Sequence, residues 1–81
     1  MTPKAMVQTT LNHWTRNYRE EIQGSPKDWL LKQAEACAQL TRLEMDVLVA
    51  GGLQEEQAWA ETRSLFCLAP PPKYDPPDEA L

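Results

Sequence analysis

The stretch GSPKDWLLKQAEACAQLTRLEMDVLVAGG, residues 24–52, contains a helix start, a long helical repeat and a helix stop. Ser25 is a favoured N-cap residue, and Pro26 suits the first helical position, where a missing N–H leaves no helix bond unmade. Asp28 lies in the first turn, where the positive end of the helix dipole favours a carboxylate. These signals predict that a helix begins at Pro26.

Glycines mark the expected helix ends. Gly51 and Gly52 follow the repeat, and glycine accepts the left-handed conformation that often closes a helix. Gly24 suits the same position at the end of an earlier helix, and Thr2–Pro3 repeats the cap-and-proline order at the start of the chain. We therefore expect three helices, over about residues 3–23, 26–50 and 53–67.

Hydrophobic side chains recur at helical spacing in these segments. The first helix has a narrow apolar stripe made by Val7, Leu11, Trp14, Tyr18 and Ile22. The second has one polar strip (Asp28, Lys32, Glu35, Gln39, Arg42 and Asp46), and its other residues include Trp29, Leu30, Ala34, Ala36, Cys37, Leu40, Leu43, Val47 and Leu48. So broad an apolar face is typical of a helix packed between two others. The predicted fold class is all-α, a small three-helix unit in which short connections make neighbouring helices antiparallel.

The segment after these helices has a different composition. Five prolines between Pro70 and Pro77 cannot continue a helix and favour a stiff, extended conformation. We therefore divide the chain into a helical domain, residues 1–68, and a proline-rich acidic tail, residues 69–81. The tail also contains PPKY, residues 71–74, which matches the P-P-x-Y pattern that WW domains bind.

The composition indicates one globular unit. The 81 residues allow one domain at most, and 42% hydrophobic with 25% charged residues is typical of a folded chain. The longest aliphatic run, VLVA, is too short to cross a membrane, and the N-terminus lacks a signal-peptide pattern. We therefore expect a cytoplasmic protein without a membrane partner. Its two cysteines are then expected to be reduced, with Cys37 in the core.

No catalytic or metal-binding pattern is present in the sequence. One His and two Cys are too few and too widely spaced for a metal site, and no glycine-rich phosphate loop occurs. Neighbouring carboxylates, as in Glu20–Glu21 and Glu55–Glu56, diverge on a helix and do not form an acid/base pair. We expect no enzyme activity, no cofactor, no metal and no small-molecule substrate.

Nucleic-acid binding is a weaker interpretation. A helix–turn–helix reading helix at LQEEQAWAETR, residues 53–63, would carry three acids that phosphates repel. The alternative is a binder that uses the first helix, where cations accompany Trp14 and Tyr18. Its candidate residues are Lys4, Arg16 and Arg19.

The favoured function is a small protein-binding accessory protein, either an adaptor or an inhibitor. Small size and acidity, here a net charge of −4, are typical of accessory proteins of phages and mobile elements. The candidate partner-binding residues lie in the tail and at the acidic end: Pro71, Pro72, Tyr74, Asp75, Glu55 and Glu56. A second alternative is a self-assembling module, in which the first two helices form a homodimer with a four-helix core.

Overall fold

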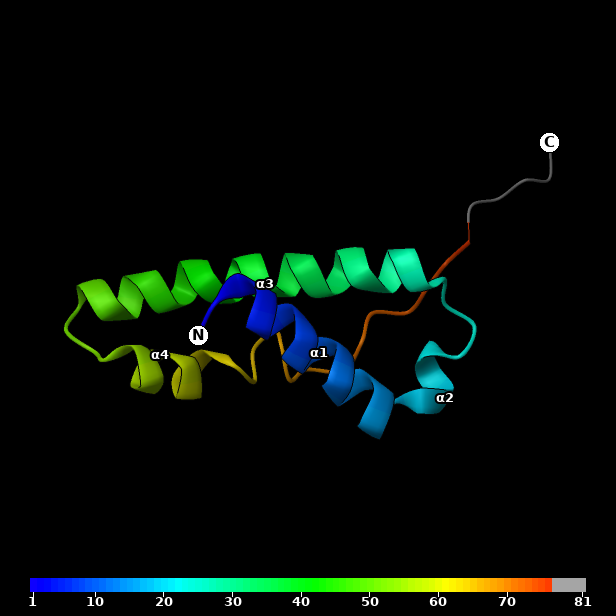
Figure 1. The fold of residues 1–81 in the computed structure, drawn as a ribbon, viewed down its shortest axis with the longest axis horizontal. Helices are drawn as coiled ribbons and strands as arrows, with labels where there is room; N and C mark the ends of the chain where they lie inside the picture. Colours follow the sequence, from blue (N-terminus) through cyan, green and yellow to red (C-terminus); the bar gives the residue numbers. More distant parts are fainter. Residues whose placement is uncertain (77–81) are drawn as a thin grey trace.

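The computed structural model describes residues 1–76 and contains four helices in that range. They are α1 (Pro3–Asn17), α2 (Arg19–Ile22), α3 (Lys27–Ala50) and α4 (Glu55–Thr62). The described residues form no strand, so the predicted all-α class is confirmed. The helix α3 is the central element: α1 and α4 both pack against it and run in the opposite direction (Figure 1).

The first predicted helix is interrupted. It begins as expected, because the Thr2 hydroxyl accepts a hydrogen bond from the Ala5 N–H at 3.1 Å. It stops after Asn17, where Tyr18 leaves the helical conformation with φ −133° and ψ 36°. The short α2 then takes a new direction, and Tyr18 and Ile22 pack against one of the two core clusters. The predicted continuous helix over residues 3–23 is therefore wrong at Tyr18, because tertiary packing there overrides helical continuity.

The start of α3 lies one residue later than expected. Its N-cap is Pro26, which is extended at φ −61° and ψ 141° and has no side-chain acceptor, so Ser25 does not occupy the predicted cap position. Gly24 does not adopt the left-handed conformation either, since the one positive φ in the described residues belongs to Gly52. The turn from α2 into α3 instead uses a hydrogen bond from the Ser25 N–H to the Ile22 carbonyl at 3.0 Å.

The end of α3 agrees with the prediction. Gly52 has φ 111°, and its N–H donates to the Val49 carbonyl at 3.0 Å. The Leu53 N–H donates to the Leu48 carbonyl, also at 3.0 Å, and these two bonds define a Schellman motif. The paired glycines thus close α3 and direct the chain into α4.

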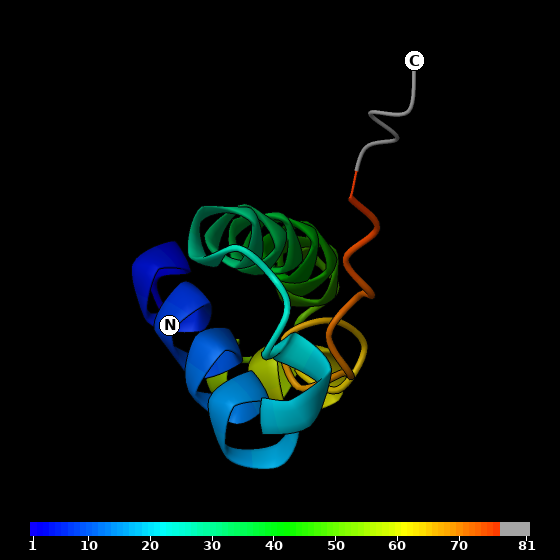
Figure 2. The ribbon, with the colours of Figure 1, turned by 90° about the vertical axis from the view of Figure 1, so that its right-hand side faces the viewer.

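The last helix is shorter than predicted. It begins at Glu55, behind a capping box formed by Gln54 and Gln57, and it ends at Thr62 and not at residue 67. Residues 63–69 form turns in which the Leu68 N–H donates to the Arg63 carbonyl at 2.7 Å. Residues 70–76 follow without helix or strand, and they pass α3 on the side away from α1 (Figure 2). The predicted shape of the whole tail stays a prediction, because residues 77–81 lie outside the described residues.

The core is built from small residues and a few large ones. One cluster contains Met6, Ala38, Met45, Ala58 and Cys67, and the other contains Trp14, Leu30 and Ala34. The predicted core position of Trp14 is confirmed, with 1% of the residue exposed. The broad buried face predicted for α3 is wrong for one of its edges, because Leu40, Leu43 and Val47 are 45%, 63% and 68% exposed. The buried face of α3 is Leu30, Ala34, Ala38, Thr41 and Met45.

Three threonines are also fully buried, one in each long helix and one in α4. Thr10, Thr41 and Thr62 each donate their hydroxyl to the carbonyl four residues earlier, at 2.8 Å. Each hydroxyl thus has a partner within its own helix, and its burial carries little desolvation cost. Threonine therefore acts here as a small core residue.

Candidate functional site

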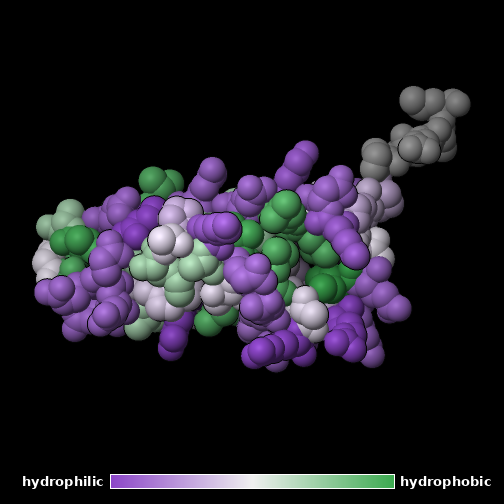
Figure 3. Space-filling model, in the orientation of Figure 1, coloured by the Kyte–Doolittle hydropathy of each residue, from purple (hydrophilic) through white to green (hydrophobic). Residues whose placement is uncertain are grey.

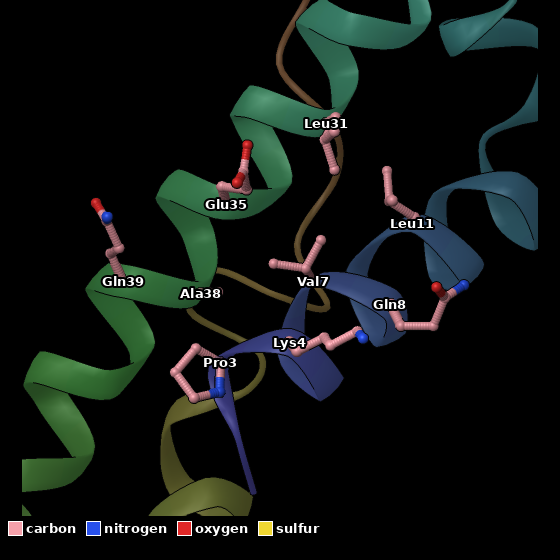
Figure 4. Close-up of a pocket in the computed structure, with 9 residues that line it drawn as sticks. All are labelled: Pro3, Lys4, Val7, Gln8, Leu11, Leu31, Glu35, Ala38 and Gln39. Atoms are coloured by element: carbon pink, nitrogen blue, oxygen red, sulfur yellow. The ribbon is translucent and has the colours of Figure 1, made fainter.

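An apolar groove lies between α1 and α3. Its floor is formed by Val7 and Leu11 from α1 and by Leu31 and Ala38 from α3, and its volume is about 450 Å³. In Figure 4 the side chains of Val7, Leu11 and Leu31 extend into the space between the two helices. Leu31 is 44% exposed, so an apolar side chain of substantial size is open to a ligand here.

Polar side chains border this groove on both sides. Lys4 and Gln8 belong to the α1 border, whereas Glu35 and Gln39 belong to the α3 border (Figure 4). The charged borders therefore differ in sign, with a cation on α1 and a carboxylate on α3. This arrangement gives a ligand both an apolar contact and a preferred orientation.

A second hollow meets the first one at Leu11 and continues toward α2. It measures about 650 Å³, and Ile22 and Leu30 supply its apolar surface, with Arg19 and Lys27 among its polar residues. Figure 3 shows hydrophobic side chains gathered on this face, over the space where α1 and α3 diverge. The two hollows together extend the groove from the start of α1 to α2.

The sequence analysis missed this groove because it did not include Leu31, the main exposed residue, in the apolar face of its helix. Leu31 lies near the polar strip of α3, beside Lys32 and one turn before Glu35. It directly follows Trp29 and Leu30, and the buried residues Ala34 and Ala38 lie three and seven positions after it. A leucine bordering a polar strip, opposite a helix with an i, i+4 apolar pair such as Val7 and Leu11, was the signal available.

The predicted partner-binding residues do not form one surface. Glu55 and Glu56 lie in the first turn of α4, next to the C-terminal end of α3. Tyr74 lies at the other end of α3, where its ring meets Trp29 edge to face, with ring centroids 5.0 Å apart. The two groups are thus separated by most of the length of α3 (Figure 1).

Within the tail group, exposure differs from residue to residue. Pro72 and Asp75 are exposed, whereas Pro71 and Tyr74 are half-buried. A WW domain inserts the tyrosine of its ligand into a pocket, so binding in that mode requires the Tyr74 ring to leave Trp29. Asp78 and Glu79, which share the acidity of this segment, lie outside the described residues.

Glu55 is engaged within the chain. Its carboxylate accepts two hydrogen bonds from the Arg42 guanidinium, at 2.9 and 3.1 Å, and Arg42 also donates to Asp46 at 2.9 Å. The hydrogen bond from Arg42 lowers the pKa of Glu55 below its ordinary value of 4.5. This contact joins α3 to the start of α4. Of the two predicted carboxylates in α4, Glu56 is exposed and has no ion-pair partner among the described residues.

The cationic residues of the nucleic-acid interpretation are exposed but dispersed. Lys4 lies in the first turn of α1, Arg16 in its last turn and Arg19 in α2. Trp14 is buried, and its indole N–H donates to the Ala69 carbonyl at 2.9 Å. The Trp14 ring is therefore enclosed, and the Tyr18 ring is half-buried against the same core cluster. This alternative stays a prediction.

The two cysteines and the histidine do not line the groove. Cys37 was predicted to lie in the core. It is half-buried and packs against both core clusters, because it lies at the edge of the α3 contact face. Burial, with a smaller contribution from Cys67, raises the pKa of its thiol above the ordinary 9.0 and so reduces its reactivity. Cys67 is buried, with its sulfur 3.2 Å from the Thr41 hydroxyl. His13 is half-buried in α1, where Asn17 Nδ2 lies 3.1 Å from its Nδ1.

Residues 1–76 contain neither a cluster of metal-ligating side chains nor a membrane-spanning helix. Over that range, no three His, Cys, Asp or Glu side chains gather closely enough to hold a metal ion. None of the helices within it has the length and apolar character needed to cross a bilayer. Comparisons with protein-family models, with curated proteins and with solved structures found no match to this chain.

Proposed function

We propose that this chain is a cytoplasmic, non-enzymatic accessory protein, an adaptor or inhibitor, whose groove between α1 and α3 receives an amphipathic helix of a partner protein. The observation that carries the proposal is the open apolar floor around Leu31, with polar borders of opposite charge. Apolar floors with polar borders are the surfaces on which amphipathic helices dock. Accessory proteins that act in this way need no reaction chemistry of their own.

A helix suits this groove because of the spacing of its floor. Val7 and Leu11 are one helical turn apart, and Leu31 faces them from the opposite side (Figure 4). A third helix laid along the groove would place apolar residues at i, i+3 or i+4 and i+7 over these three side chains. Covering the exposed part of Leu31 alone contributes about 1 kcal/mol, since full burial of a leucine is worth about 1.5–3 kcal/mol.

The borders specify the charges of the partner helix. Lys4 favours an acidic side chain on the flank that faces α1, and Glu35 favours a basic one on the flank that faces α3. These contacts are exposed, so they contribute more to orientation and specificity than to affinity. We therefore expect a partner helix with an apolar stripe between an acidic and a basic edge.

The test is photocrosslinking from the groove inside the native cell. A photoreactive residue replaces Leu31, and the matched control carries the same residue in place of Leu65, which is 57% exposed in the segment after α4. We expect one protein to be captured from position 31 and not from position 65. A synthetic peptide of its crosslinked segment should then be helical when bound to the purified chain.

Charge substitutions provide the second arm. Leu31→Glu should weaken binding of that peptide by about tenfold or more, because a carboxylate replaces an apolar contact. Leu65→Glu should leave binding unchanged. Equal binding by the Leu31→Glu protein would contradict the groove as the site, and capture from the tail at Tyr74 would transfer the function to the proline-rich segment. Failure to capture any protein from either surface would contradict the function itself.

A further inference from the structure

A second apolar surface runs along the outer face of α3. It consists of Ala36, Leu40, Leu43 and Val47, which we call the outer stripe, and all four residues are exposed. No described segment of the chain covers it. Because Leu43 and Val47 are each more than 60% exposed, the outer stripe is the largest aliphatic contribution of α3 to the molecular surface.

The spacing of the outer stripe is that of a coiled-coil seam. Its residues are separated by four, three and four positions, and the same alternation continues to Gln33 and Trp29 on one side and to Ala50 on the other. A repeat of this kind keeps one face of a helix toward a single partner helix over three heptads. The face is therefore shaped for a long helix, and α3 is the longest helix of this chain.

The charges beside the outer stripe indicate the identity of the partner helix that would cover it. On one flank, seven residues apart, are Lys32, Gln39 and Asp46. Lys32 is exposed and has no ion-pair partner among residues 1–76, and the side chain of Asp46 is 62% exposed although it contacts Arg42. A cation at one end, a carboxylate at the other and an amide at the midpoint form a self-complementary series when a second copy runs in the opposite direction.

We propose that two copies of this chain associate through their outer stripes, with the two α3 helices antiparallel. The two-fold axis passes near residue 38, so that Lys32 of each copy meets Asp46 of the other and the two Gln39 side chains meet each other. A parallel arrangement brings neither of these flank pairs together, because it opposes residues of equal number in the seam. Charge complementarity therefore selects the antiparallel arrangement.

The same register also matches side-chain sizes across the seam. Ala36 of one copy opposes Leu40 of the other, Gln33 opposes Leu43, and Trp29 opposes Val47. Leu40 thus meets a small residue and Leu43 a flexible one, whereas Val47 meets the larger ring of Trp29 in the final layer. The Tyr74 ring packs edge to face on Trp29, so the segment around Tyr74 borders the final layer of the interface.

This interface lies beside the groove that receives a partner helix. Gln39 borders both surfaces, and Leu43 of the outer stripe lines a small hollow with Pro3 at the start of α1. The rest of the stripe lies on the side of α3 opposite its buried residues. Dimerisation would therefore place two grooves on one particle. The contact is one helix pair of about three heptads, at the low end of interface size, and we expect a Kd on the order of micromolar.

The first test is sedimentation equilibrium of the purified full-length chain over a range of concentrations around that Kd. The wild-type mass should rise from that of one chain to that of two. Leu43→Glu, at a residue 63% exposed in the monomer, should keep its helical circular dichroism and remain monomeric. A wild-type chain that stays monomeric at every concentration, or a Leu43→Glu chain that dimerises like wild type, overturns the proposal.

Charge reversal tests the orientation. Lys32→Glu should weaken the dimer roughly tenfold, because two symmetric pairs become repulsive. The double variant Lys32→Glu/Asp46→Lys should recover to within about twofold of wild type, since the pairs are restored with reversed sign. Lys4→Glu, which makes the same charge change on α1, should have no effect. A double variant no tighter than Lys32→Glu overturns the antiparallel register.

Disulfide trapping gives a second readout of the register. In a Cys37→Ala background, Gln39→Cys should form a covalent dimer on oxidation, because the two residues 39 meet at the two-fold axis. Lys32→Cys should not, because its neighbour across the seam is Asp46. The reverse pattern, or crosslinking from a photoreactive residue at 43 to a different protein while the chain stays monomeric, overturns the proposal.

Discussion

Replacing Trp14 with phenylalanine tests how the chain after α4 is attached to α1. The indole N–H of Trp14 donates to the Ala69 carbonyl across 55 positions of sequence, and the residue is 1% exposed. Phenylalanine keeps an aromatic ring in the core but has no donor. The Ala69 carbonyl, in a half-buried residue, then loses its partner.

The cost of Trp14→Phe follows from these contacts. An acceptor left without its donor costs about 1–3 kcal/mol, and the volume vacated by the smaller ring adds about 1 kcal/mol. The expected loss is therefore about 2–4 kcal/mol, out of a total stability of about 4–12 kcal/mol for a chain of this size. The Tm should fall by roughly 10–25 °C.

Urea unfolding followed by far-ultraviolet circular dichroism measures this loss, with Trp59→Phe as the control. Trp59 is half-buried against the other core cluster and lacks a comparable hydrogen bond within residues 1–76, so its replacement should cost less than about 1.5 kcal/mol. In NMR spectra, the Trp14 indole proton should exchange with solvent most slowly of the three. A Trp14→Phe loss below about 1 kcal/mol, or fast exchange of that proton, would refute the attachment.

Two further expectations concern the turns and the ion pair. Gly52→Ala should lower the free energy of unfolding in urea by about 1–3 kcal/mol, because φ is 111° at this position. Gly24 lies in equally open space without a positive φ, so Gly24→Ala should be neutral or stabilising by up to about 1 kcal/mol. Equal effects at both sites would contradict the reasoning. Because its hydrogen bond with Arg42 lowers the pKa of Glu55, that pair stabilises the fold above pH 4.5 and is lost as the pH falls through the lowered folded-state pKa. Glu55→Gln should therefore narrow the stability difference between pH 6 and pH 3, as measured by thermal unfolding, and an unchanged pH dependence would show that the pair is not formed in solution.

Local signals predicted the start of α1 and the end of α3, whereas the Gly24 and Ser25 signals before α3 are not used as predicted. Thr2–Pro3 and Gly51–Gly52 act through bonds within their own turns, and the structure has these bonds. Tyr18 carries no such local signal, because nothing in its neighbourhood forbids a helix. Its departure from helical geometry is tied to packing against residues of α3, which only the folded chain brings near.

The choice of buried face on α3 was not predictable from hydrophobicity. The side that meets α1 and α4 contains Ala34, Ala38 and Thr41, whereas the larger Leu40 and Leu43 lie on the outer edge. Small side chains let helix axes approach closely, and the buried threonine hydroxyls bond to their own helix. A hydropathy scale ranks threonine and alanine below leucine, so it assigned the larger residues to the core.

This distribution of residue sizes also bears on why both proposed surfaces exist. A chain of 81 residues has little surface to bury, and its exposed aliphatic residues, among them Leu31, Leu43 and Val47, would increase core volume if they faced inward. They lie instead on two separate faces, one beside a groove and one along a heptad seam. Single exposed leucines are ordinary, but aliphatic residues repeated at coiled-coil spacing and bordered by complementary charge are typical of surfaces that are covered in an assembly.

If the outer stripe is covered by a second copy, the dimer is more stable than the monomer, and Leu43→Glu should lower the Tm at high protein concentration but not at low concentration. A Tm that falls equally at both concentrations would show that Leu43 stabilises the monomer and would remove this argument.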